Sequence, residues 1–513
     1  MSEDVELGLK QNAASPVHSL PVELLLQVVH HTLRPFLQNN KSGYYRHLLS
    51  LSGVCSHWYS VIRDSPPLWT QIHASDSPNF IEMALRRSSS HVIDITCHKY
   101  TSPGRDPENI QKFLDTIFLH RNRWRTLDVI TACSWMSYLT TALEESAPSL
   151  EKLSLTDQDT LSSALEVDLF GGTAPQLKDL TLNGVSTRWD GELVHGLKLI
   201  DLSYIDFPST KTVLDILSHS PQLQQATVWR RSTRSISTDS SHSIRLSQLS
   251  ILRMDLGSLE AIDNILDSLK VAEWSSLSIP LLTGEHVGGF LQSRVAGWTS
   301  NWNVTAMLQL GGLLLEIEPN NLRMGIVTPS YPEALTFAVE VLRTEGTEFL
   351  LALSSIVDKL ASWAKGSATI HLKLGYSPFI YPFNRVDTRQ LFVNELSRLP
   401  PITSLEISSV ENNSLVNILI REGASSFFRN VSTLSFSAIS ASDLQLDFVS
   451  PIVRSIKAAT EIPLDELDRK RNLQKVELRV PVDGSAEPIV KELEGIVGPG
   501  KVFVFNIDSD NLL

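Results

Sequence analysis

Leu177-Lys178-Asp179-Leu180-Thr181-Leu182 carries an apolar residue at its first, fourth and sixth positions. Its second half alternates apolar and polar residues, which is typical of a β-strand with one buried face. The same spacing recurs along the chain, at Trp124-Leu127-Val129, Leu150-Leu153-Leu155, Leu177-Leu180-Leu182, Leu197-Ile200-Leu202, Leu223-Ala226-Val228, Leu249-Leu252-Met254 and Trp274-Leu277-Ile279. Successive starts lie 20 to 27 residues apart, so the sequence predicts strands at a nearly constant interval.

This interval and this spacing of apolar residues are typical of leucine-rich repeats, whose period is about 20–29 residues. A proline precedes three of the predicted strands, at Pro148, Pro175 and Pro221. Because proline ends a helix, the predicted repeat unit is a helix, a proline stop and a strand.

The pattern loosens between residues 281 and 400, where we expect strands at 304–310, 322–327 and 368–374 and a helix at 332–364. It resumes at Ile402-Leu405-Ile407, Val431-Leu434-Phe436 and Leu473-Val476-Leu478, with a last strand at 502–505. The segment 230–243 is rich in Ser, Thr and Arg, which predicts an exposed loop. That loop is either a tolerated insertion between repeats or a site of phosphorylation.

The N-terminal part has a helical pattern instead. Residues 1–17 are polar and acidic and are predicted to be a flexible leader. A helix is expected to begin at Pro21 and to end near Leu33, before Pro35. A second helix is expected to run from Leu48, with apolar residues recurring at spacings of three and four: Leu48, Leu51, Val54, Cys55, Trp58 and Ile62.

Three blocks of this region together resemble the F-box. They are Leu20-Pro21-Val22-Glu23-Leu24-Leu25, Leu48-Leu49-Ser50-Leu51-Ser52-Gly53-Val54-Cys55-Ser56-His57-Trp58 and Asp64-Ser65-Pro66-Pro67-Leu68-Trp69. The whole chain resembles fungal F-box proteins with degenerate leucine-rich repeats. One departure from the F-box pattern is the link from Arg34 to His47, which is longer than the usual short turn.

The resemblance implies an α/β fold in two parts. A three-helix F-box at residues 18–73 is followed by an irregular leucine-rich-repeat solenoid at 74–513, with parallel strands, outer helices and an irregular stretch between 281 and 400. The F-box would bind a Skp-family adaptor, and through it cullin and RING subunits. Its adaptor-binding residues, by their match to the motif, are Leu20, Pro21, Leu24, Leu25, Leu51, Val54, Cys55, Trp58, Leu68 and Trp69.

The chain would then be the substrate-recognition adaptor of an SCF-type (Skp-cullin-F-box) E3 ubiquitin ligase, and not itself an enzyme. A different class of function stays open, in which a helical cap closes a protein-binding leucine-rich-repeat scaffold without ligase association. A third possibility is an enzyme with an unrecognised site between 281 and 400.

Candidates for binding an unknown protein substrate lie between the apolar pattern residues, because these positions point away from the core. They are Asp179, Thr181, Asn183, Asp201, Thr227, Trp229, Arg253 and Asp255. Trp229 and Arg253 belong to the residue types most often found at binding hot spots. Each of them also fits an ordinary solvated strand face.

Composition argues against several other functions. The chain of 513 residues has a net charge of −13, which opposes binding to nucleic acid or to an anionic membrane. Cys55, Cys97 and Cys133 form no C-x-x-C pair, so neither zinc nor disulfides are expected and a reducing compartment fits. With no secretory signal or membrane span predicted, we expect a cytoplasmic or nuclear protein, or one found in both.

No cofactor, metal or catalytic motif is predicted. Residues 495–501 satisfy G-x-x-x-x-G-K, the pattern of a phosphate-binding loop. However, Val502 follows where that loop needs Ser or Thr. The segment is also predicted to lead from a helix into a strand, opposite to the order that cradles phosphate, so we interpret it as a glycine-rich helix stop.

Overall fold

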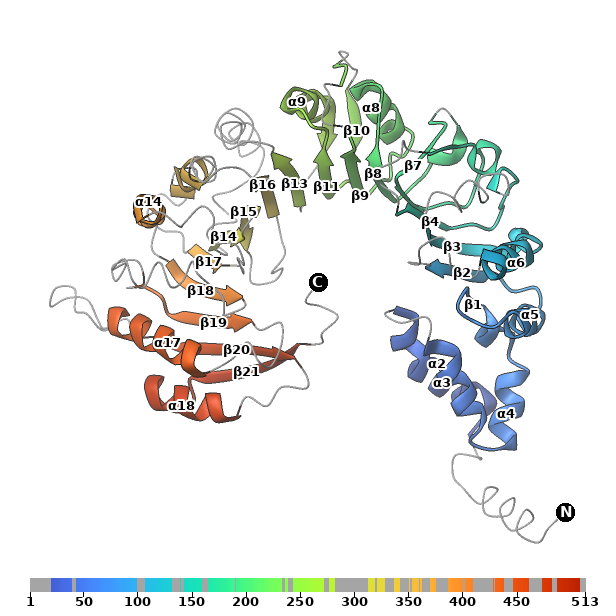
Figure 1. The fold of residues 1–513 in the computed structure, drawn as a ribbon, viewed down its shortest axis with the longest axis horizontal. Coiled ribbons are helices and arrows are strands. Elements are labelled where there is room, and N and C mark those ends of the chain that lie inside the picture. Colours follow the sequence, from blue (N-terminus) through green and yellow to red (C-terminus); the bar gives the residue numbers. More distant parts are fainter. Residues whose placement is uncertain are drawn as a thin grey trace, which may run out of the picture. The chain divides into compact units, whose positions relative to one another are not determined.

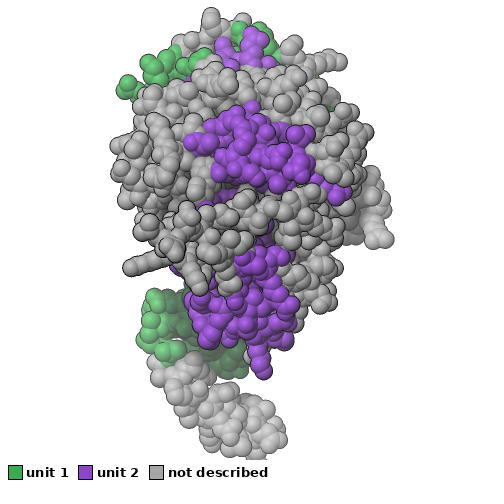
Figure 2. Space-filling model, turned by 90° about the vertical axis from the view of Figure 1, so that its left-hand side faces the viewer, with its two compact units in different colours: residues 1–248, 267–270 green, residues 249–266, 271–513 purple. Residues whose placement is uncertain are grey.

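The computed structural model divides the chain into two compact units (Figure 2), which are described separately. Unit 1 comprises residues 1–248 and 267–270, and unit 2 comprises residues 249–266 and 271–513. The structure describes residues 20–38, 43–98, 107–131, 139, 143–158, 165–189, 191–232, 236–238, 243–271, 276–281, 312–318, 321–327, 336–341, 350, 353–358, 360–361, 370–374, 386–399, 402–408, 428, 430–437, 446–460, 473–481 and 487–507.

Unit 1 begins with the three predicted helices (Figure 1). They are α2 (Val22–Gln38), α3 (Tyr44–Ser52) and α4 (Ser56–Arg63), followed by the short 3-10 helix η3 (Pro66–Trp69). Proline stands at the first two positions of η3, where its missing N–H costs no hydrogen bond.

Two predicted helix boundaries in this region are wrong. The single helix expected from Leu48 to Ile62 is broken at Gly53, and Cys55 is extended, with φ −165° and ψ 172°. Glycine is a poor helix former, and it lets the chain leave α3 before α4 begins. Pro35 does not end α2, whose last turn is held against α3 by stacking of Phe36 on His47, with 3.9 Å between ring centroids.

The long link predicted between Arg34 and His47 is therefore mostly helical. The two helices leave only residues 39–43 between them. The departure from the F-box pattern seen in the sequence largely disappears in the structure.

The rest of unit 1 is an α/β region with parallel strands. Its neighbouring strands, in order, are β1 (Gln71–His73), β2 (Ile93–His98), β3 (Trp124–Thr131), β4 (Lys152–Asp157), β6 (Asp179–Asn183), β8 (Leu199–Ile205) and β9 (Gln225–Arg230). The predicted strands at Trp124, Leu150, Leu177, Leu197 and Leu223 are all present. Sequence reasoning missed β1 and β2.

Connecting elements complete unit 1. They are α5 (Pro78–Arg87), α6 (Pro107–Phe118), η4 (Arg121–Arg123), η5 (Leu169–Gly172), η6 (Glu192–Val194), α8 (Thr210–Ser218) and the short strands β5 (Leu165–Val167), β7 (Val185–Thr187), β10 (Ile244–Leu246) and β12 (Leu269–Val271), the last of which ends at the unit boundary. Helices α5, α6 and α8 lie on one side of the parallel strands (Figure 1).

The apolar pattern residues of unit 1 form two rows across neighbouring strands. One row joins Leu127, Leu153, Leu180, Ile200 and Ala226, and the other joins Val129, Leu155, Leu182, Leu202 and Val228. Every side chain in both rows is at most 1% exposed. Burial at about 1.5–3 kcal/mol for each large side chain makes these rows the main source of stability in the sheet.

In unit 2, hydrogen bonding places the strands in the order β11 (Ile251–Asp255), β13 (Ser276–Leu281), β16 (Thr336–Val341), β15 (Asn321–Val327), β14 (Gly312–Glu318), β17 (Ile370–Leu374), β18 (Ile402–Ser408), β19 (Thr433–Ser437), β20 (Lys475–Pro481) and β21 (Val502–Ile507). The helices are α9 (Leu259–Ser268), whose end crosses the unit boundary, α14 (Val386–Leu396), α17 (Leu446–Thr460) and α18 (Glu487–Val497).

The irregular middle departs from the predicted order. The prediction of a helix at 332–364 is wrong at β16, because the sequence Thr-Phe-Ala-Val-Glu-Val favours a strand. Strand β14 was not predicted, and β15 pairs antiparallel with both β14 and β16, so not all strands are parallel. The strands expected at 322–327 and 368–374 correspond to β15 and β17, whereas the strand expected at 304–310 lies outside the described residues.

Two further predictions concern loops. The segment 230–243 does not simply project, because Ile236 is buried and Ser237 forms a bridge with Ser209. The segment pairs with the chain near α8 and covers an apolar residue. Its polar composition did not indicate this contact. The glycines at 495–501 do lead from α18 into β21, with φ of 103° at Gly498 and 71° at Gly500, as expected for a helix stop.

Gly184 provides a test of the turn after β6. Its φ is +70°, and an added Cβ would lie 3.3 Å from the Asp157 Cβ. We expect Gly184→Ala to lower the free energy of unfolding by about 1–2 kcal/mol, because left-handed backbone strains alanine. In α18, Gly495 has open space around it, so Gly495→Ala should raise the stability by about 0.5–1 kcal/mol. Thermal unfolding of both variants measures the two changes in stability. Changes of the same sign would contradict the prediction.

Candidate functional site

The N-terminal helices are held together by an apolar core. Leu25, Val29 and Leu33 of α2 are fully buried, as are Leu48 of α3 and Ile62 of α4. The three buried residues of α2 recur every four positions, so one face of the helix is buried and the other is left to solvent.

Aromatic residues tie this core to the α/β region. The Tyr44 hydroxyl donates to the Leu68 carbonyl at 3.2 Å, and the Trp69 indole N–H donates to the Ile62 carbonyl at 2.9 Å. Tyr45 stacks on Trp69, with 5.9 Å between ring centroids. The Arg87 guanidinium of α5 lies 4.4 Å from the Trp69 ring centroid, a cation–π contact.

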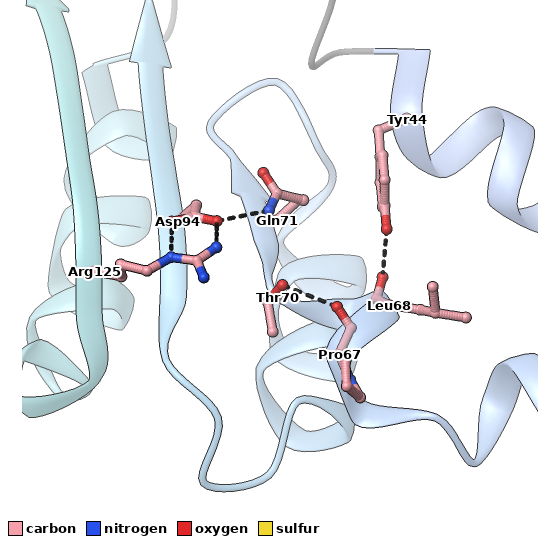
Figure 3. Close-up of polar contacts among 7 residues, drawn as sticks. All are labelled: Tyr44, Pro67, Leu68, Thr70, Gln71, Asp94 and Arg125. Atoms are coloured by element: carbon pink, nitrogen blue, oxygen red, sulfur yellow. Dashed lines mark hydrogen bonds and ion pairs between the residues drawn. The ribbon is translucent and has the colours of Figure 1, made fainter. Parts of the chain in front are cut away.

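A chain of polar contacts continues from η3 into the sheet (Figure 3). Thr70 donates to the Pro67 carbonyl at 3.0 Å, and β1 begins at the next residue. Gln71 Nε2 donates to Asp94 Oδ2 at 2.8 Å, and Arg125 Nε donates to Asp94 Oδ1 at 2.9 Å. Burial alone would raise the pKa of Asp94, but the hydrogen bonds and charge of Arg125 outweigh it, so this pKa lies below its usual value. The helical part and the sheet are thus joined without a flexible linker.

The residues predicted to bind an adaptor fall into two groups. Six are exposed or half-buried: Leu20, Pro21, Leu24, Leu51, Val54 and Cys55. The other four, Leu25, Trp58, Leu68 and Trp69, belong to the core. Only the first group offers surface for direct contact, whereas the second group supports the shape of that surface.

Four exposed apolar residues of the helices were missed by sequence reasoning: Val22, Val28, Leu49 and Tyr59. Together with Leu24 and Val54 they are between 44% and 56% exposed, and we call these six the exposed F-box set. Val28 follows Leu24 by four positions on α2, so the helical spacing could have identified it. Arg63 lies over the Tyr59 ring, 5.5 Å from its centroid, and provides a charged neighbour to this apolar surface.

Most of the predicted substrate-binding residues meet on the polar face of the sheet in unit 1. One polar row runs across six strands through Thr96, Asp128, Ser154, Thr181, Asp201 and Thr227, and the next runs through Thr156, Asn183, Ser203 and Trp229. Asp179 lies beside Lys152 and Leu199 in a third row. The members on β2, β3 and β4 were missed, although the apolar spacing at Trp124 and Leu150 already implied those on β3 and β4.

Two polar atoms of this face lack satisfied hydrogen bonds. The Trp229 indole N–H and the Asn183 Oδ1 are shielded from solvent and find no partner among the described residues. Between them in the same row lies Ser203, whose hydroxyl donates to Asp201 Oδ1 at 2.6 Å. A shielded polar atom without a partner costs about 1–3 kcal/mol, so this part of the face is one where a bound molecule could stabilise the structure.

Arg253 and Asp255 belong to β11 of unit 2. Arg253 is exposed, whereas Asp255 is half-buried and accepts a hydrogen bond from the Gly257 N–H at 2.9 Å. Burial raises the pKa of Asp255.

Comparison with known proteins identifies the N-terminal part. Residues 17–75 match the family described as F-box-like. No curated protein and no solved structure matches the chain. The chain thus carries an F-box-like domain, and F-box domains commonly bind Skp-type adaptors.

Neither a metal site nor a membrane-spanning helix is found in the described part of the chain. There, no group of three or more His, Cys, Asp or Glu side chains is placed to hold a metal ion. Nor is any described helix long and apolar enough to cross a membrane. Cys97 is buried and Cys55 is half-buried, and Cys133 lies outside the described residues.

Asp76 provides a pH test of the junction between the helices and the sheet. Burial raises the pKa of Asp76 to about 6, although a hydrogen bond from the backbone of His73 acts to lower this pKa. Because the folded chain disfavours the ionised form, it should lose stability as pH rises from about 4 to 6. We expect Asp76→Asn to raise the free energy of unfolding by roughly 1 kcal/mol near neutral pH, allowing for partial solvent access, and by less near pH 4.5.

Denaturant unfolding of the wild type and of Asp76→Asn at both pH values measures the change in the free energy of unfolding. Asp64→Asn is the control, because its exposed carboxylate accepts hydrogen bonds from Arg63 that lower its pKa. This control should show no gain near neutral pH. An equal gain by Asp76→Asn at both pH values would rule out the titration of Asp76 as the cause.

Proposed function

We propose that this protein is the substrate-recognition adaptor of an SCF-type E3 ubiquitin ligase. The F-box binds a Skp-family adaptor, which connects it to cullin and RING subunits, and the α/β region binds a protein substrate. The chain itself contributes geometry and no reactive groups. The observation that carries this proposal is the F-box-like domain at residues 17–75, with six large apolar side chains left to solvent on its helices.

The exposed F-box set supports the adaptor interface. A small helical domain does not need these side chains for its own core, which is already filled by Leu25, Leu48 and Ile62. Exposed apolar side chains concentrated on one small domain are typical of a protein-binding surface. Each of them is already about half buried, so covering the rest would contribute roughly 1 kcal/mol per residue toward the cost of association.

The α/β region is proposed to be an irregular leucine-rich-repeat solenoid. Support comes from the near-constant interval of the predicted strands and from the in-register apolar rows of unit 1. In such an array the polar rows face away from the helices and bind partners. The unsatisfied atoms of Trp229 and Asn183 favour this face as a binding surface.

The junction supports a role in holding a substrate at a fixed distance from the ligase. Trp69 contacts both Tyr45 and Arg87, and Asp94 contacts both Gln71 and Arg125. These contacts join the F-box to the first strands of the sheet. A rigid junction holds a bound protein near the conjugating enzyme, and proximity of this kind accelerates transfer.

The adaptor interface is tested by a pull-down with a purified Skp-family adaptor. We expect the wild-type chain to bind and Leu24→Asp/Val54→Asp to lose at least about a hundredfold in affinity, because two charges would be buried in an apolar contact. Both side chains are about half exposed, so the variant should fold as the wild type does. Trp58→Ala is unsuitable, because Trp58 belongs to the core.

Leu119→Asp is the matched control, since Leu119 is 81% exposed and lies outside the F-box. It should bind the adaptor as tightly as the wild type. If neither wild type nor control binds, the ligase proposal is wrong. The α/β region would then be a protein-binding scaffold with a helical cap.

A further inference from the structure

Strand β21 leaves one of its edges open. Within unit 2 it pairs with β20 alone among the described strands. The Lys501 carbonyl accepts from the Val476 N–H of β20 at 2.8 Å. Backbone groups alternate in direction along a strand, so Phe503 and Phe505 also point their backbone groups toward β20. The N–H and C=O groups of Val502, Val504 and Asn506 therefore face the open edge.

Apolar side chains surround this edge. Phe503, Val504 and Phe505 are 43%, 42% and 44% exposed. Val504 continues the row of Phe436 and Leu478, both fully buried, so a core row of the sheet ends in solvent.

The edge also lacks the features that prevent strands from pairing between molecules. Natural edge strands carry charged residues, prolines or bulges. From Val502 to Ile507 the sequence is Val-Phe-Val-Phe-Asn-Ile, with no charge, proline or glycine. Lys475 lies on the neighbouring strand β20, with its Nζ 5.2 Å from the Phe503 ring centroid and 5.7 Å from that of Phe505.

We propose that β21 binds β21 of a second copy of this chain, antiparallel and about a two-fold axis through Val504. In this register Val504 exchanges both backbone hydrogen bonds with its counterpart, and Val502 does so with Asn506 of the other copy. Phe503 of one copy lies opposite Phe505 of the other, where aromatic cross-strand pairs stabilise sheets. The two sheets then become continuous, and the ends of both core rows are covered.

Charge and area both favour a second copy. A strand without charge offers no complementarity to a charged partner, whereas it meets its own copy without repulsion. The exposed parts of the two rings and Val504 amount to roughly 200 Å² per chain. Two such edges bury less than the ~1,200 Å² of a stable interface, so the dimer is reversible and depends on concentration. This inference goes beyond the proposed ligase function and does not depend on it.

Sedimentation equilibrium over a wide range of protein concentration tests the dimer. We expect the mean mass of the full-length chain to rise from one chain toward two as the concentration increases. Val504→Lys should raise the dissociation constant at least about tenfold, because it sets two like charges opposite each other. Leu391→Lys is the matched control, since Leu391 is an exposed apolar residue of α14 in the same unit, 52% exposed. Circular dichroism melts check that both variants stay folded.

Cross-linking tests the register. Across a hydrogen-bonded antiparallel pair the Cα atoms lie about 5.5 Å apart, within reach of a short bismaleimide. Val504→Cys should give a covalent dimer in high yield, while the wild type and Leu391→Cys should give little. A wild type that stays monomeric at every concentration, or a Val504→Lys variant that dimerises equally well, would overturn the proposal. Dimerisation without the Val504→Cys cross-link would overturn the register.

Discussion

The structure depends on the register between neighbouring strands. Strands such as β4 and β6 bury one face, and their apolar residues are covered only when those of the next strand lie directly beside them. A slip of one residue would turn every apolar side chain to the opposite face. The rows through Leu180 and Leu182 show the result, because the same alignment that buries them also aligns Thr181 and Asn183 with the polar residues of neighbouring strands. Core and polar face therefore arise from one constraint.

The sequence predicted this part of the fold well because the signal is local and repeated. Leu177, Leu180 and Leu182 are recognisable without knowledge of their partners, and later strands repeat the spacing. The middle of the chain could not be predicted in this way. There β15 runs antiparallel between β14 and β16, and its pairing depends on residues whose spacing follows no repeat. One helix boundary failed for a related reason, since a tertiary contact of Phe36 holds the last turn of α2 past Pro35.

For the candidate site, the sequence predicted residue types better than their exposure. Motif matches brought together Leu24 and Trp58, yet the first is half exposed and the second belongs to the core. A motif includes residues needed for folding as well as residues needed for binding. Only the packing of the three helices shows to which group each residue belongs. Leu49 lies within an F-box block and Tyr59 directly follows it, but the motif did not show that both side chains reach solvent.

The contacts between the F-box-like domain and the sheet also limit how these two parts can be separated in an experiment. The family match at residues 17–75 includes β1, and Ile72 of β1 lies beside Ile95 of β2. Removing the domain at its boundary would take away the first strand of the sheet, uncover an apolar edge and leave Asp94 without Gln71. A truncated chain would then differ from the intact one in solubility and stability as well as in adaptor binding. The F-box-like domain thus supplies the first strand of the sheet, and point substitutions on its surface are the cleaner way to silence it.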